Sequence, residues 1–279
     1  MYCIDFEYDG QRLSDYGCVV CHISSSPDLN TVNIGSQITF NTINLPLQNK
    51  FKAMSAQYQE AYTTTFEIGK FNCNTENDCV LTQEEVSSLM RWLNRKRYCK
   101  FKMIYENDEF GNIYYIGSFN VQMITYCGDV IGLELTLQTN APFGYYESID
   151  CKMNFITGGD TEKISVFDIS DEIGSIYPHN VKIKCLDSGD LIIHNSQDGK
   201  RSTVINNCVE GEILMLDGEN KIITSSENHV RLYNDFNYNF IKISNKSENT
   251  INDIQNEFTV SLPCEISFSY SPICKMGIV

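Results

Sequence analysis

The chain has 279 residues, of which 42% are hydrophobic and 11% aromatic, so it can bury one large core or two medium ones. Strand-forming residues are plentiful, which favours a β-rich fold over a helical bundle. The net charge of −15 repels phosphate backbones and argues against specific nucleic-acid binding.

The N-terminal residues lack the basic region and the long apolar run of a signal peptide. No stretch approaches about 18 consecutive apolar residues, so no transmembrane helix is expected. We therefore expect the protein to fold in a cytoplasm, with most of its 12 cysteines reduced and buried in strands.

Alternation of apolar and polar residues predicts short strands at the start of the chain. These strands cover residues 2–6, 18–21, 37–45 and 61–71. Residues 46–60 are polar and irregular, and we interpret them as a connection.

One segment is predicted to be helical. Thr82 is followed three residues later by Glu85, which is the pattern of a capping box. The apolar residues that follow at helical spacing are Val86, Leu89, Met90 and Leu93. Basic residues at the end of this segment complement the helix dipole.

Strands resume after the helix and dominate the rest of the chain. In the first half they cover 99–105, 112–126 and 131–137, with a hairpin loop at 106–111. Residues 158–175 are interpreted as a linker mixed with a first strand. Nine strands are then predicted, at 181–186, 191–195, 202–206, 212–216, 221–224, 229–233, 240–244, 257–262 and 265–270. This regular spacing is typical of a β-sandwich or barrel.

No motif for nucleotide binding, zinc proteolysis or serine hydrolysis is present, and the four histidines (His22, His179, His194 and His229) are far apart. We therefore predict no enzyme, no catalytic residues and no cofactor. Cys18 and Cys21, followed by His22, have the spacing of half a zinc site, with Cys73 and Cys79 as a loosely spaced second pair. We favour a structural interpretation, in which Cys18 and Cys21 fill a strand and no metal binds.

A basic cluster lies at the end of the predicted helix and on the following strand. Its members are Arg91, Arg95, Lys96, Arg97, Lys100 and Lys102. Two interpretations stay open: a solvated helix end, or a surface that contacts acidic patches on a neighbouring subunit.

The order of the elements resembles that of the distal tail proteins of siphophages. The segments that carry the resemblance are Ile4-Asp5-Phe6, Asp15-Tyr16-Gly17-Cys18, Leu93-Asn94-Arg95, 114–119, 133–145, 189–193, Gly211-Glu212, Leu216-Asp217-Gly218, Asn234-Asp235-Phe236, Phe258-Thr259-Val260 and 268–272. The resemblance implies a mainly β protein with one helix: an N-terminal ring-forming belt domain at residues 1–147 and a C-terminal galectin-like β-sandwich at 148–279.

The same resemblance implies a structural protein of the virion tail tip, assembled in the host cytoplasm. It would form a homo-hexameric ring that joins the tail tube to the tip or baseplate. Its expected partners are itself, the tail tube protein, a tail-associated tip or hub protein, and the tape measure and receptor-binding proteins, with no membrane. The alternatives are a carbohydrate-binding tail module and a subunit of the tail tube or hub.

Overall fold

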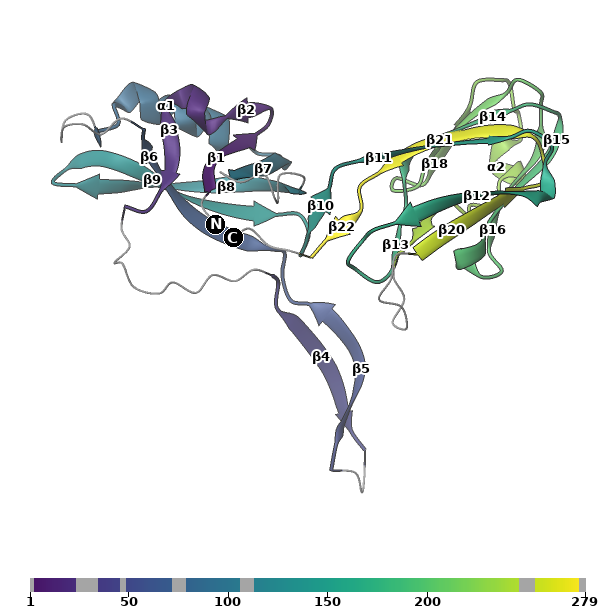
Figure 1. Cartoon of the computed structure of the whole chain (residues 1–279), viewed down its shortest axis with the longest axis horizontal. Helices are drawn as coiled ribbons and strands as arrows, with labels where there is room; N and C mark the ends of the chain where they lie inside the picture. The colour runs from purple at the N-terminus through teal and green to yellow at the C-terminus, as the bar shows by residue number, and fades with distance from the viewer. Residues whose placement is uncertain are drawn as a thin grey trace. The chain divides into compact units, whose positions relative to one another are not determined.

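The computed structural model describes residues 3–23, 35–45, 49–71, 79–105, 113–245 and 254–275. Its contacts divide the chain into two compact units (Figure 1). Unit 1 comprises the chain up to Tyr146 together with the C-terminal segment that starts at Cys274, and unit 2 comprises Glu147–Ile273. The predicted mainly β fold is confirmed, but the described residues form two α-helices where one was predicted: α1 (Gln83–Leu93) and the short α2 (Leu232–Asp235). Neither is long and apolar enough to cross a membrane.

Unit 1 is built on one extended β-sheet. Its strands lie in the order β2 (Gln11–Arg12), β1 (Cys3–Tyr8), β7 (Cys99–Tyr105), β8 (Ile113–Tyr126), β9 (Asp129–Thr139), β6 (Thr63–Lys70) and β3 (Cys18–Cys21). Two short strands extend it, because β10 (Gly144–Tyr146) pairs with β8 and with β22 (Ile273–Cys274). The predicted loop 106–111 lies outside the described residues.

The helix α1 begins where the sequence predicts. The Thr82 hydroxyl accepts a hydrogen bond from the Glu85 backbone N–H at 3.3 Å, and the Glu85 carboxylate accepts one from the Thr82 N–H at 2.7 Å. The predicted capping box is therefore confirmed. The helix buries Leu89, Leu93 and also Trp92.

The core of unit 1 is an aromatic cluster between α1 and the sheet. The Phe6 ring, fully buried on β1, lies 5.6 Å from that of Trp92, 5.4 Å from Phe101 and 5.8 Å from Phe119. The Trp92 indole N–H donates to the Tyr8 carbonyl at 2.9 Å, so this buried polar group is satisfied. These contacts fix the helix on the sheet.

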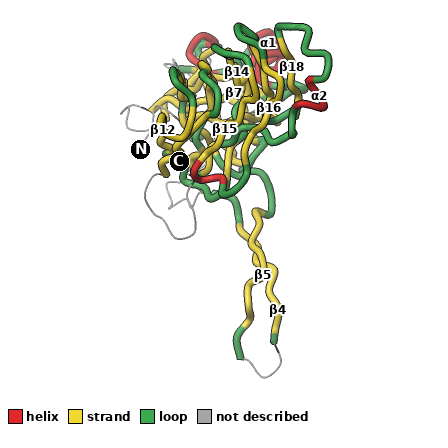
Figure 2. The backbone as a smooth tube through the Cα atoms, turned by 90° about the vertical axis from the view of Figure 1, so that its right-hand side faces the viewer, coloured by secondary structure: helices red, strands yellow, loops and turns green. Residues whose placement is uncertain are grey.

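Two strands of unit 1 form a separate two-stranded ribbon, β4 (Ile38–Asn44) with β5 (Phe51–Tyr58). Figure 2 shows this ribbon as an arm of paired strands. The prediction that 46–60 is an irregular connection is wrong for the residues of β5. Their mixed polar pattern does not indicate a strand, but they form one because they pair with β4.

Unit 2 consists of two antiparallel sheets around one apolar core. The larger sheet has the order β11 (Ile149–Phe155), β21 (Cys264–Tyr270), β14 (His179–Cys185), β17 (Ile213–Asp217) and β18 (Ile222–Ser225). The smaller has the order β12 (Gly159–Asp168), β20 (Ile254–Val260), β15 (Gly189–Asn195) and β16 (Ser202–Cys208). Every second residue of β14 and β15 faces inward, and Ile183 on β14 and Ile193 on β15 are buried in the same core, as expected for facing sheets.

Three predictions for unit 2 are wrong in detail. Residues 158–175 contain the predicted first strand but less linker than expected, because β12 is a strand of 10 residues that pairs with β20. Residues 229–233 are not a strand, because the chain turns there and α2 begins at Leu232. Of the predicted strand 240–244, only β19 (Ile243–Ser244) forms, and it pairs with β13 (Ser175–Ile176).

Candidate assembly surfaces

The ribbon has one apolar and one polar face, because residues paired across two strands point to the same side. The apolar face consists of Ile38, Phe40, Thr42 and Asn44 on β4 with Phe51, Ala53, Ala56 and Tyr58 on β5. The other face carries Thr39, Asn41, Ile43, Lys52, Ser55 and Gln57. Met54 sits at the irregularity in the register.

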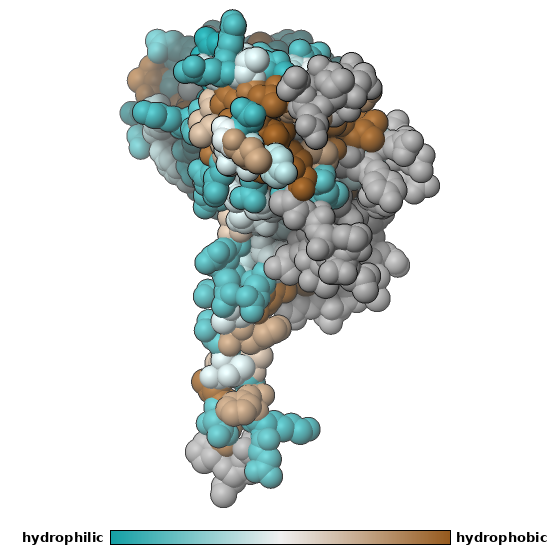
Figure 3. Space-filling view, turned by 90° about the vertical axis from the view of Figure 1, so that its left-hand side faces the viewer, coloured by the Kyte–Doolittle hydropathy of each residue, from teal (hydrophilic) through white to brown (hydrophobic). Residues whose placement is uncertain are grey.

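The apolar face is exposed. Phe40 is 60% exposed, Phe51 is 74% exposed and Ile38 is 47% exposed. Figure 3 shows tan and brown residues along this arm among teal ones. A two-stranded hairpin is marginally stable in water by itself, and its open edges invite pairing. The ribbon therefore has the character of a surface that is covered in an assembly.

Hydrogen bonds anchor the base of the ribbon to the sheet of unit 1. The Ser36 hydroxyl donates to the Pro142 carbonyl at 3.2 Å, and the Gln59 N–H donates to the Gln37 carbonyl at 2.9 Å. The buried Thr139 hydroxyl donates to the Tyr62 carbonyl at 2.8 Å. The root of the ribbon is thus held by two side-chain-to-backbone hydrogen bonds and by one backbone bond between its own two sides.

The predicted basic cluster is partly engaged within its own unit. The guanidinium groups of Arg95 and Arg97 lie 3.7 Å and 3.0 Å from one Asp9 carboxylate oxygen. Arg91 Nε donates to the Ser87 carbonyl at 3.3 Å, one turn back along α1. Exposed ion pairs of this kind contribute little stability, so they mainly set the direction of the side chains.

The remaining members lie close to this group in the sequence. Lys96 is exposed directly after α1, whereas Lys100 and Lys102 lie on β7. Lys100 Nζ stands 4.1 Å from the centroid of the Tyr114 ring, which is a cation–π contact. The structure therefore places the six basic residues on one helix end and the adjoining strand.

Unit 2 holds a buried ionic site that the sequence analysis did not single out. His229 Nδ1 lies 2.9 Å from Glu212 Oε1, and His229 Nε2 lies 3.2 Å from Asp235 Oδ2. Glu212 also accepts from the Ser225 hydroxyl at 2.6 Å and from the Val209 N–H at 3.0 Å. The side chains of Glu212 and His229 are 0% and 7% exposed.

The two carboxylates favour the charged form of the histidine. Burial opposes ionisation, but hydrogen bonds from Ser225, Val209 and His229 outweigh it and lower the pKa of Glu212. Burial likewise opposes the imidazolium, but the hydrogen bonds to Glu212 and Asp235 outweigh it and raise the pKa of His229. Ionised carboxylates only accept hydrogen bonds, so both ring nitrogens carry a proton. Neither nitrogen is left to take a proton from a hydroxyl, as a general base must.

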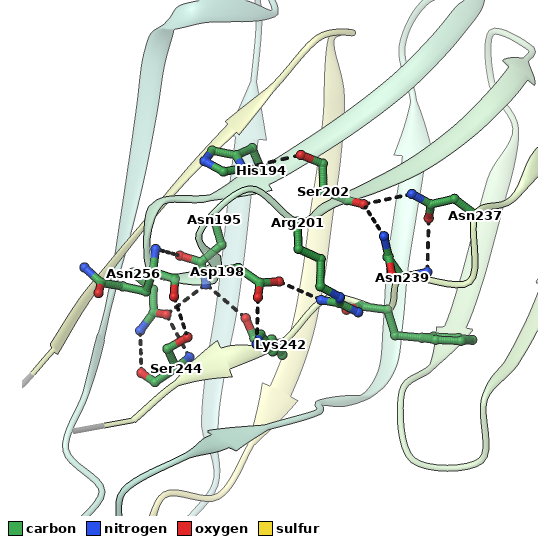
Figure 4. A network of polar contacts seen from close by, with 12 residues as sticks. His194, Asn195, Asp198, Arg201, Ser202, Asn237, Asn239, Lys242, Ser244 and Asn256 are labelled. Atoms are coloured by element: carbon green, nitrogen blue, oxygen red, sulfur yellow. Dashed lines mark hydrogen bonds and ion pairs between the residues drawn. The ribbon is translucent and has the colours of Figure 1, made fainter. Parts of the chain in front are cut away.

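A second polar network ties loops to the smaller sheet of unit 2 (Figure 4). Asp198 lies 2.6 Å from both Arg201 Nη1 and Lys242 Nζ, with its side chain 7% exposed. Asn195 donates to Asn256 at 2.8 Å and to the Lys242 carbonyl at 3.0 Å. Because Lys242 bonds Asp198 and its carbonyl accepts from Asn195, the network holds 196–201 and 240–245 against the sheet.

The candidate zinc ligands are not assembled in the part of the chain that the structure describes. Cys18 is buried in β3 and its thiol donates to the Tyr16 carbonyl at 3.6 Å, while Cys21 at the strand end is half-buried. Cys73 lies outside the described residues. Within the described ranges, no group of three His, Cys, Asp or Glu side chains is placed to hold a metal ion.

Among solved structures, that of Dit (gp 19.1) of phage SPP1, reported as a paradigm of the hub adsorption apparatus in Gram-positive infecting phages, is similar over 97% of this chain and 99% of that one. The TM-score is 0.63 at 12% identity, which establishes a shared fold. A chain of the activated phage p2 baseplate covers 96% of this chain and 98% of its own, with a TM-score of 0.47 and 10% identity.

Two family models match the sequence. One, described as a phage tail protein N-terminal domain, matches residues 1–141, and the other, described as a phage tail C-terminal domain, matches residues 143–270. No curated protein matches the chain. Because the first model spans half of the chain and the second follows it directly, the chain belongs to a family of phage tail proteins and has the Dit fold.

Proposed function

We propose that this protein is a structural distal tail protein of a siphophage. It forms a hexameric ring that joins the tail tube to the tail tip or baseplate, and it carries out no chemistry. The observation that supports this most is the likeness to SPP1 Dit, which extends over both units and nearly the full length of both chains. Its partners are the tail tube protein, a tip or hub protein, and the tape measure and receptor-binding proteins.

Within this proposal the two halves have different tasks. Residues 1–147 are the belt that closes the ring, and residues 148–279 are a galectin-like sandwich that anchors other tip proteins. The amphipathic ribbon supports the first assignment, because it belongs to unit 1 and exposes an apolar face. The two sheets of unit 2 around one core support the second.

The ring closes through two kinds of contact. The apolar face of the ribbon is buried against a neighbouring copy, where loss of exposed apolar area drives association. The basic cluster at the end of α1 (Arg91, Arg95, Lys96, Arg97, Lys100 and Lys102) faces acidic surface on a neighbour, which a chain of net charge −15 offers in abundance. Exposed charge pairs set register and rate of association more than affinity.

Light scattering and negative-stain microscopy of the purified full chain test this proposal. We expect closed rings with six times the 31.8 kDa chain mass, which bind to the ends of purified tail tubes. A chain that stays monomeric at high concentration and binds no tube contradicts the proposal. Binding of glycans by such a monomer would favour a carbohydrate-binding tail module instead.

A further inference from the structure

Residues 226–236 follow β18 and pack against the core of unit 2. The Ser226 N–H donates to the Ile213 carbonyl at 2.9 Å, which fixes the start of the segment. Leu232 and Phe236 are buried in the core, and Phe236 forms a β-bridge with Ile205 on β16. The middle of the segment is tied by the side chain of His229.

The groups around His229 come from four elements. Glu212 precedes β17, Asp235 lies on α2, Ser225 ends β18, and the buried Cys208 thiol ends β16. Glu227 and Arg231 of the segment itself line the same open depression of about 350 Å³. The imidazolium therefore joins the segment to the start of β17 through Glu212, while its contact with Asp235 is internal to the segment.

The rim of this depression is poorly packed. Val230, next to His229, is 83% exposed, and Val209 and Tyr233 are also exposed. Apart from Leu232 and Phe236, the segment thus offers little apolar burial to hold it closed. Among the described contacts, the ion pair of His229 with Glu212 links its middle to the sheet.

We propose that His229 is a proton-dependent latch: the doubly protonated ring holds residues 226–236 to Glu212 by a charged contact, and loss of a proton weakens this contact and loosens the segment. In this loosened form the segment swings on its two ends and uncovers Glu212. The latch is a property of unit 2 and does not depend on ring formation.

The pH window follows from the two pKa shifts. The pKa of His229 is raised above its ordinary 6.5, so its contribution is complete below that pH and is lost as pH rises through the folded value. The pKa of Glu212 is lowered from 4.5, so its contribution is complete above that pH and is lost as pH falls through the folded value. The latch is therefore tightest between these two ordinary values and opens on the alkaline side.

Hydrogen–deuterium exchange of the assembled full chain, read by peptide mass spectrometry from about pH 5 to about pH 9, tests the latch. After correction for intrinsic exchange, we expect protection of residues 226–236 to fall about tenfold in a single titration, as for loss of a charged hydrogen bond. In His229→Gln the segment should be open at every pH. The control His179→Gln removes an exposed histidine, 3.0 Å from Glu219, and should leave the titration unchanged.

A second variant tests the latch independently if His229→Gln misfolds. Asp235→Asn keeps the bond to Glu212 but removes one of the two charges that raise the pKa of His229. The opening midpoint should then move to lower pH, which a merely structural role for His229 would not produce. The latch is refuted if wild-type protection is flat across the range, or if the midpoint of Asp235→Asn coincides with that of wild type.

Discussion

Replacing Phe40 by Ser should weaken ring formation without unfolding unit 1. A phenylalanine side chain that is buried completely removes about 200 Å² from water. Because Phe40 is 60% exposed, a neighbour can bury about 120 Å² more of it, which corresponds to about 3 kcal/mol at 25 cal/mol per Å². Each subunit contact should therefore weaken by about a hundredfold in association constant.

Sedimentation velocity over a dilution series measures this effect. The matched control is Phe167→Ser in unit 2, because Phe167 is 59% exposed and lies on β12, outside the ribbon. We expect Phe40→Ser to dissociate at much higher concentration than wild type, and Phe167→Ser to behave as wild type. If Phe40→Ser and wild type assemble at the same concentration, the ribbon does not hold the ring together.

Three further predictions concern stability and reactivity. Thr82→Ala removes the cap of α1 and should lower the free energy of unfolding of unit 1 by about 1 kcal/mol in urea titrations, and an unchanged midpoint would contradict this. Glu212→Gln at pH 6 leaves the buried His229 charge with one carboxylate and should lower the free energy of unfolding of unit 2 by about 3 kcal/mol. This difference between variant and wild type should shrink as pH falls through the lowered pKa of Glu212, because wild type then loses the same contact. A maleimide should label exposed Cys127 long before Cys264, since burial raises the pKa of the Cys264 thiol to about 12, and equal labelling rates would refute this assignment of burial.

Local signals predicted the elements that are stabilised locally. The helix α1 was predictable because its cap and its apolar spacing both lie within 12 residues, 82–93. The strands β7, β8, β9, β14 and β15 were predictable because buried and exposed residues alternate along them. The sequence did not indicate that Trp92 is buried, because a residue directly next to Leu93 does not fit the helical spacing of the predicted apolar face.

The predictions from sequence were wrong for elements that depend on partners distant in the chain. The strand β5 has all but one of its residues exposed, so no buried alternation marked it, and only pairing with β4 defines it. Two glycines in the left-handed region, Gly158 just before β12 and Gly159 at its first position, indicated a linker. Residues 229–233 have strand-like composition, but His229 turns inward to bond Glu212.

The sequence by itself determined the mainly β character, the one long helix and the acidic surface, because composition, periodicity and caps act over a few residues. It also marked the six basic residues as a group, since they are neighbours along the chain. Only the tertiary structure decided which carboxylates meet His229, because packing brings Glu212, 17 residues away, to the segment that holds His229 and Asp235. The apolar face of the ribbon was likewise decided by register, since strand pairing, not spacing along either strand, places Phe40, Ala56 and Phe51 on one side.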